Sequence, residues 1–321
     1  MKRKIAMLLV GLMCVSATGC SFSKSGNELE KINSADIFTE ISEDSIIEGQ
    51  TAADDFTKAL TAVEKLENIT INVTNGIIMG SEGQENYQNS LNESEIKLAK
   101  DGDKNVGSVA IHNTYKSAGE ATSGESNAKE QTEENSITGY YSGDALYFIT
   151  NDGDKVKEEM GYSDFLGVVS TYNLSIYSDC ISKAACVAGK NSKTYYISYD
   201  PTKFETTMTT NMEASGQVLA DGEAMKIKYA NIVAEIDNDG NLLNYGFIIN
   251  AEYVNDNNTI PYDYSITAEF IDKDNTKVEA VTDTDSYMTA EEYTKKMQEA
   301  AQAASESATT EAVSQAENTT K

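Results

Sequence analysis

Four consecutive stretches in the last third of the sequence have the pattern of β-strands. They lie near residues 224–236, 242–254, 262–272 and 277–282. Short runs rich in Asp, Asn and Gly separate them, at 237–241, 255–258 and 272–275. Because these residue types favour tight turns for steric reasons, the region from Glu223 to about Asp283 predicts an antiparallel β-meander.

Further strand patterns precede this meander. Apolar or aromatic residues alternate with polar ones near residues 69–73, 96–98, 106–115, 137–150 and 195–199. Gly189–Asn191 is a plausible hairpin turn between two strands. Tyrosine is abundant (18 residues) and proline is rare (2 residues), a composition that is compatible with extended sheet.

Helical periodicity interrupts the strands at three places. One helix is expected over residues 52–66 and a second over 162–177. A third is expected to begin at Asp200–Pro201, with Asp200 as its cap. Since strands dominate the rest of the chain, the expected fold class is α+β, mainly antiparallel β.

The amino terminus has the organisation of a secretory signal. A cationic head at residues 2–4 precedes an apolar core from Ile5 to Val15, followed by small residues up to Cys20. The core spans about 11 residues, too few for a bilayer-crossing helix, which needs roughly 20. An ordinary secretory signal that happens to end before a cysteine is the alternative to a lipoprotein signal.

Residues Ala17–Cys20 resemble the lipobox of bacterial lipoproteins, with Ala17 where the usual residue is Leu. The resemblance implies that Cys20 is lipidated and becomes the first mature residue. The protein would then be anchored by its lipid at the extracytoplasmic face of the cell membrane. Removal of residues 1–19 takes away three positive charges and changes the net charge from −27 to −30. Such a surface repels nucleic acid, so no nucleic-acid partner is expected.

Two cysteines remain in the mature chain, Cys180 and Cys186. In an oxidising compartment they could form a disulfide, and two buried thiols are the alternative. A straight strand would separate them by about 20 Å, beyond disulfide reach, so a bond requires the chain to loop there. Either interpretation is structural, because the Cys-X-X-Cys spacing of redox motifs is absent.

Composition divides the chain into four parts. Residues 1–19 are the signal, and residues 20–50 are expected to form a lipidated, flexible tether. Residues 51–285 are expected to form one β-rich domain, with a disordered loop at 116–136 that lacks aromatic and branched aliphatic residues. Residues 286–321 are expected to form a short helix and a disordered tail. Two average domains would also fit the length of the mature chain.

The order of these elements resembles the LolA-like fold of lipoproteins. The resemblance depends on Tyr140–Tyr147, on Tyr195–Pro201 and on the closing meander. It implies a strongly curved, half-barrel sheet with helices packed on its concave side. It also implies that a lipid or another apolar ligand occupies the hollow between sheet and helices. Candidate lining residues are Phe56, Leu60, Phe165, Leu166, Phe204, Met208 and Met212; filling of the core is their alternative role.

The chain is not expected to be an enzyme or to need a cofactor. Its one histidine, His112, lies in an expected strand, and nothing directs a nucleophile towards it. Motifs of serine hydrolases, P-loop proteins and zinc proteases are absent. Carboxylates are so abundant that any chosen pair is uninformative. Asp237–Asn241 resembles the start of a calcium loop, but its glycine is misplaced, so a turn is favoured and no metal is expected.

Two functional hypotheses follow for a membrane-anchored protein of this kind. The first is a binding protein that holds a lipid or other apolar ligand in a concave cavity. The second is a non-catalytic interaction or sensor domain that docks another envelope protein. A cavity of several hundred Å³ would favour the first hypothesis, and a filled core with an exposed apolar patch would favour the second.

Overall fold

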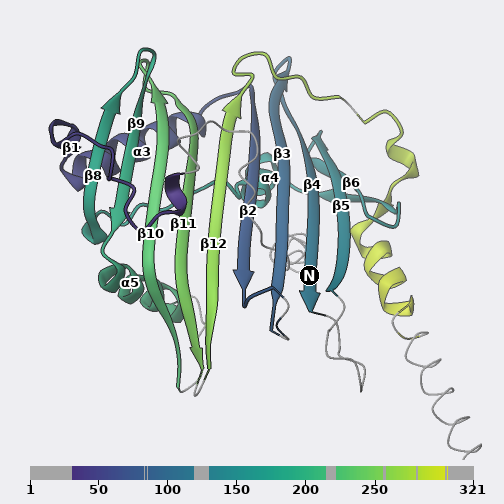
Figure 1. The fold of residues 1–321 in the computed structure, drawn as a ribbon. Helices are drawn as coiled ribbons and strands as arrows, with labels where there is room; N and C mark the ends of the chain where they lie inside the picture. Colours follow the sequence, from purple (N-terminus) through teal and green to yellow (C-terminus); the bar gives the residue numbers. More distant parts are fainter. Residues whose placement is uncertain are drawn as a thin grey trace, which may run out of the picture.

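A computed structural model describes residues 31–82, 84, 86–118, 130–214, 222–255, 258–279, 281–300 and 302. Its main feature is one sheet of thirteen strands (Figure 1). The strands are β1 (Ile46–Ile47), β2 (Ile69–Met79), β3 (Gln88–Asp101), β4 (Lys104–Ala118), β5 (Glu130–Ser142), β6 (Ala145–Ile149), β7 (Lys155–Glu159), β8 (Ile181–Ala188), β9 (Ser192–Tyr199), β10 (Glu223–Asp237), β11 (Leu242–Asn255), β12 (Asn258–Ile271) and β13 (Met288–Thr289).

The strand order is β1-β8-β9-β10-β11-β12-β2-β3-β4-β5-β6-β7-β13. Neighbouring strands are antiparallel, except that β13 runs parallel to β7. Tight hairpins connect several pairs. At Gly143–Asp144 both residues have positive φ, 59° and 61°, which is the geometry of the two-residue turn that suits the twist of the flanking strands. The predicted mainly antiparallel α+β class is therefore confirmed.

The strong curvature implied by the LolA-like resemblance is not confirmed. The sheet ends in β1 on one side and β13 on the other, and these two-residue strands do not pair with each other. Closure of a sheet requires its first and last strands to be hydrogen-bonded. The sheet therefore stays open, and its strands do not curl strongly enough to confirm a half-barrel (Figure 1).

Three helices pack against the same face of the sheet, which we call the helix-bearing face (Figure 1). They are α3 (Gly49–Val63), α4 (Tyr162–Val169) and α5 (Pro201–Ala214). One apolar core joins them to the inward side chains of the strands, and Phe56, Phe165 and Phe204 bury one aromatic ring from each helix in it. The carboxylate of Asp200 accepts a hydrogen bond of 3.0 Å from the Lys203 amide, as expected of a helix cap.

The predicted tether is wrong for residues 31–50. Residues 31–41 pack against the opposite, outer face of the sheet, residues 46–47 form an edge strand, and residues 49–50 begin α3. This segment contains the 3-10 helices η1 (Lys31–Asn33) and η2 (Glu43–Ser45) and the edge strand β1. A second apolar cluster joins its side chains to those of β8–β11; its members are Ile32, Ile37, Phe38, Ala185, Tyr196, Val233 and Ile248. Burial of these few apolar side chains, which have no clear periodicity, orders a stretch that is polar on average.

Pairing between strands also changes other predicted bounds. Residues 116–118 and 130–136 were expected in the loop, but they belong to β4 and β5, whose backbone ladder is continuous there. The expected strand at 277–282 is absent from its described residues, and β12 pairs with β2 instead. This pairing joins the closing meander to the earlier strands within one sheet.

One of the helices described by the structure is shorter than predicted. The helix expected over residues 162–177 ends at Val169, where the backbone leaves the helical conformation at Ser170. The short helix expected within residues 286–321 is present at residues 290–300 and 302, and Tyr293 is buried against the core. The signal, Cys20 and the tail beyond residue 302 lie outside the described residues. Within the described ranges, no helix combines the length and apolar character needed to cross a bilayer.

Candidate ligand-binding site

A cleft with a volume of about 450 Å³ lies on the helix-bearing face, where the end of α3 and the helix α4 meet β3 and β4. The residues that line it are Glu64, Lys65, Leu66, Glu67, Leu98, Lys100, Asn105, Tyr162, Leu166, Gly167, Ser170 and Tyr172. The volume falls within the range of about 300–1,000 Å³ that is typical of small-molecule sites. The lining divides into an apolar part and a charged part.

The apolar part exists because α4 is seated closely on the sheet. Phe165 is fully buried and lies directly over Gly107 of β4, where a Cβ atom would come within 2.5 Å of its ring. The ring also stacks on Tyr141, with 4.9 Å between centroids. This packing fixes α4 so that Leu166 and Gly167 line the cleft. A Cβ atom at Gly167 would meet no atom within 4 Å, so the space beside it is open.

Two tyrosines complete the apolar wall. The Tyr245 hydroxyl donates a hydrogen bond to the Tyr172 carbonyl and so fixes the irregular segment that follows α4. Burial raises the pKa of Tyr172; a hydrogen bond with Ser170 acts in the opposite direction, and the Glu64 carboxylate adds to the rise. Burial, with smaller contributions from Tyr172 and Glu67, also raises the pKa of Tyr162. Both hydroxyls therefore remain neutral near pH 7.

The charged part of the lining carries two carboxylates and two ammonium groups. Lys100 of β3 forms an ion pair with Glu67, which follows α3. Glu64 and Lys65 lie at the end of α3 and are exposed. Asn105, the second residue of β4, adds an uncharged amide to the same cleft. The cleft can therefore contact an apolar group on one side and a polar, charged group on the other.

The structure does not bring the seven predicted lining residues together in one cavity. Phe56, Leu60, Phe165 and Phe204 are buried members of the core. Met208 is half-buried against that core, and Met212 is half-buried elsewhere on α5. Of the seven, only Leu166 lines this cleft. Sequence reasoning missed Leu98, Tyr162 and Tyr172 as lining residues. Leu66 could have been predicted as a lining residue, because it belongs to the apolar periodicity of the first expected helix.

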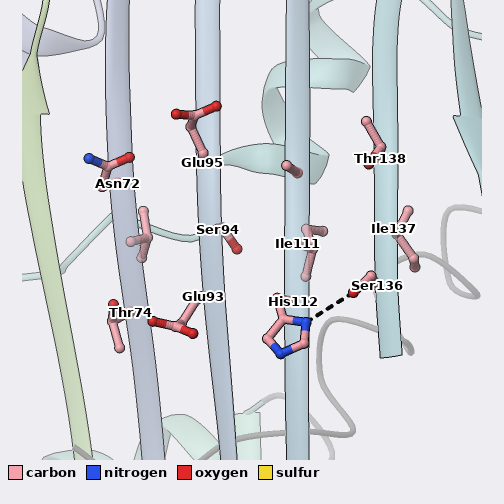
Figure 2. A pocket seen from close by; sticks show the side chains of 12 residues that line it. Asn72, Thr74, Glu93, Ser94, Glu95, Ile111, His112, Ser136, Ile137 and Thr138 are labelled. Carbon is pink, nitrogen blue, oxygen red and sulfur yellow. Dashed lines mark hydrogen bonds between the residues drawn. The ribbon is translucent and has the colours of Figure 1, made fainter. Parts of the chain in front are cut away.

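A second hollow, of about 510 Å³, lies on the outer face over β2–β5. Figure 2 shows its polar side chains in cross-strand rows, with Glu93 and His112 on neighbouring strands. His112 Nδ1 lies 2.9 Å from the Ser136 hydroxyl oxygen. Glu95, the other carboxylate of this hollow, forms an ion pair of 2.5 Å with Lys97. The lining of this hollow also includes Val73, Ile111 and Ile137, but no tyrosine or phenylalanine ring.

The two cysteines of the mature chain and the acidic turn at Asp237–Asn241 have structural roles. Cys180 and Cys186 are both free thiols, so the predicted alternative of a disulfide between them is wrong. Ile181–Ala188 is an extended strand, and it carries Cys186 away from Cys180. At the acidic turn, burial alone would raise the pKa of Asp237, but hydrogen bonds from Asn241 and Asp239 lower it overall. Its carboxylate is thus occupied within the turn. Among the described residues, no group of three or more potential ligands could hold a metal ion.

Comparison with known proteins gives no family for this chain. No family model matches it, and no curated protein does. Among solved structures, it is similar to the lipoprotein LppX of Mycobacterium tuberculosis, with 8% identity, a TM-score of 0.29, and coverage of 73% of this chain and 99% of that one. It is also similar to a porin-like protein of Bacteroides uniformis, with 9% identity, a TM-score of 0.21, and coverage of 64% and 96%. TM-scores this low carry no argument about function.

Proposed function

We propose that this protein is a lipid-anchored, extracytoplasmic binding protein that holds the apolar part of an amphiphile in the cleft between α3, α4 and the sheet. In this proposal it has no catalytic activity. Leu66, Leu98 and Leu166, together with Tyr162 and Tyr172, supply the apolar contact surface. This combination of an apolar wall and a charged rim in one cleft is the observation that carries the proposal.

The anchor in this proposal is a lipid on Cys20, which depends on the lipobox-like sequence Ala17–Cys20. Two acyl chains hold a protein stably at a bilayer, whereas one chain gives only marginal binding. A membrane-attached protein meets amphiphiles at high local concentration. The placement therefore agrees with the chemistry of the cleft.

The alternative of a docking or sensor domain has less support. Such a domain would be favoured by a contiguous apolar patch on its surface. The exposed large apolar side chains among the described residues are Ile46, Ile271 and Met297. They belong to β1, to the end of β12 and to the last helix, so they do not share one element.

The test fills the cleft without disturbing the core. Gly167→Phe places a ring in the open space beside α4, and phenylalanine has a higher helix propensity than glycine. We expect the full-length chain with Cys20→Ser to bind a pyrene-labelled diacylglycerol, and Gly167→Phe to weaken that binding by about tenfold or more, or roughly 1.4 kcal/mol. This neutral probe reports the apolar contact alone.

Ser163→Phe is the matched control, because Ser163 is an exposed residue of α4 that does not line the cleft. It should bind the probe as the parent chain does, and both variants should keep the parent's urea midpoint. Equal probe binding by the parent and Gly167→Phe, or no binding by the parent, would refute the proposed function.

A further inference from the structure

The charges around the cleft are balanced in a chain that is otherwise strongly acidic. Over the whole sequence, 52 Asp and Glu residues face 25 Lys and Arg residues. The cleft, in contrast, is lined by two glutamates and two lysines, Glu64, Lys65, Glu67 and Lys100. A purely anionic ligand would meet both carboxylates, and a purely cationic one would meet both ammonium groups.

The carboxylates act on the aromatic part of the lining. The charge of Glu64 contributes to the raised pKa of Tyr172, and the charge of Glu67 contributes to that of Tyr162, after burial in each case. Each tyrosine that lines the cleft is therefore within electrostatic reach of one glutamate. Aromatic rings beside carboxylates are the surroundings that stabilise a ligand ammonium group, including a quaternary one.

The opposite charge has its own partners in the same cleft. Lys65 and Lys100 provide ammonium groups, and Asn105 provides an amide that can donate hydrogen bonds. Hydrogen bonds from such groups to a phosphate or carboxylate are charge-assisted and stronger than neutral ones. Lys100 forms an ion pair with Glu67, so a bound anion would share this lysine and leave Glu67 available to an ammonium group.

We propose that the amphiphile held in this cleft has a zwitterionic headgroup, with an anionic group placed by Lys65 and Lys100 and an ammonium group placed by Glu64, Glu67 and the two tyrosines. This inference rests on the proposed function, because it assigns the headgroup of the same ligand. It names a ligand class, a phosphate-and-ammonium lipid such as phosphatidylcholine.

The experiment compares four lipids with identical acyl chains, each offered in detergent micelles to the full-length chain with Cys20→Ser. They are phosphatidylcholine, phosphatidic acid, a trimethylammonium lipid and diacylglycerol. We expect phosphatidylcholine to displace the pyrene-labelled probe at a concentration at least tenfold lower than any of the other three. Equal displacement by phosphatidylcholine and diacylglycerol would overturn the zwitterion inference while leaving the proposed function intact. Stronger displacement by phosphatidic acid or by the trimethylammonium lipid, each of which carries charge of one sign only, would do the same.

Variants assign the two halves of the headgroup. Glu64→Gln should reduce the preference for phosphatidylcholine over phosphatidic acid, and Lys100→Gln should reduce the preference over the trimethylammonium lipid, each by about fivefold or more. Lys97→Gln is the matched control, because Lys97 forms a similar ion pair with Glu95 on the same strand but does not line the cleft. A control that changes the preferences as much as Lys100→Gln would overturn the assignment. Failure of all four lipids, diacylglycerol included, would instead refute the proposed function.

Discussion

Asn231 of β10 is predicted to control the docking of the amino-terminal segment on the outer face. Its side chain is fully buried (0% exposed) and bonds to three groups. The amide nitrogen donates to the carbonyls of Ile32 and Ser34, at 3.3 and 2.8 Å, and the amide oxygen accepts from the Ser198 hydroxyl at 2.7 Å. Asn231→Ala removes all three bonds, so the carbonyls of Ile32 and Ser34 lose the donor that joins them to the sheet.

The magnitude follows from these contacts. Each lost hydrogen bond contributes about 0.5–1.5 kcal/mol net. Two of the three bonds join Asn231 to the segment, so the variant should weaken docking by about 1–3 kcal/mol. The apolar side chains of the segment add roughly 1.5–3 kcal/mol each for Ile32, Ile37 and Phe38. The conformational entropy lost when the segment becomes ordered offsets much of this gain. Docking is therefore marginal, and the loss should release the segment locally rather than unfold the sheet.

Hydrogen exchange measured by mass spectrometry checks this outcome. Peptides that cover residues 31–41 should exchange about fivefold or more faster in Asn231→Ala, because 1.4 kcal/mol corresponds to a factor of ten. Peptides from β2 and β3 should keep the parental rate. Asn244→Ala is the control, since Asn244 bonds Glu235 on the neighbouring strand at 2.9 Å and has no bond to the segment. Unchanged exchange over residues 31–41 in Asn231→Ala would refute the reasoning.

Three further predictions concern the core, the titration of one buried group, and the anchor. Gly107→Ala should lower the free energy of unfolding by about 1–3 kcal/mol in urea titrations, because its Cβ would overlap the Phe165 ring; a parental midpoint would contradict the packing. Burial raises the pKa of Glu158, so a charged carboxylate at this position destabilises the folded state. This destabilisation is absent below about pH 4.5, where the carboxyl group is protonated in both states, and it is fully present once the pH has risen through the folded pKa. Glu158→Gln should therefore stabilise the protein at pH 7, by less than about 1 kcal/mol after solvent screening, and not at pH 4; an equal gain at both pH values would exclude this cause. Cys20→Ser should move the protein from the membrane to the soluble fraction with an unchanged fold, and continued firm membrane association would defeat the anchor.

Local periodicity carried most of the strand prediction. Ile69, Ile71 and Val73 alternate with polar residues, and all three point into the core from β2. The Asp237–Asn241 turn and the cap at Asp200 also lie where their residue types predict them. These features depend on neighbours in the sequence, so a single sequence specifies them.

Contacts between distant segments were not predictable in the same way. The pairing of β12 with β2 joins residues that are about 180–200 positions apart, such as Phe270 and Ile71, and the sequence of neither strand identifies its partner. The docked residues 31–41 were missed for a related reason. Their few apolar residues show no period, and only the outer face of β8–β11 makes their burial favourable.

The candidate site was predictable only in part. Phe56, Phe165 and Phe204 have the apolar character expected of lining residues, but that character serves a filled core equally well. Leu166 lines the cleft because Phe165, its neighbour, occupies the space over Gly107 and so sets the rotation of α4. The position of the cleft thus depends on the packing of one ring, which no pattern in the sequence encodes.

Native mass spectrometry of the full-length chain with Cys20→Ser, recovered from a bacterial cell envelope, tests the central claim most directly. The account predicts a retained species that organic extraction identifies as an amphiphile and that is missing from Gly167→Phe, while Ser163→Phe retains it. A parent chain that shows only its own mass and takes up no offered lipid would contradict the claim, as would equal retention by Gly167→Phe.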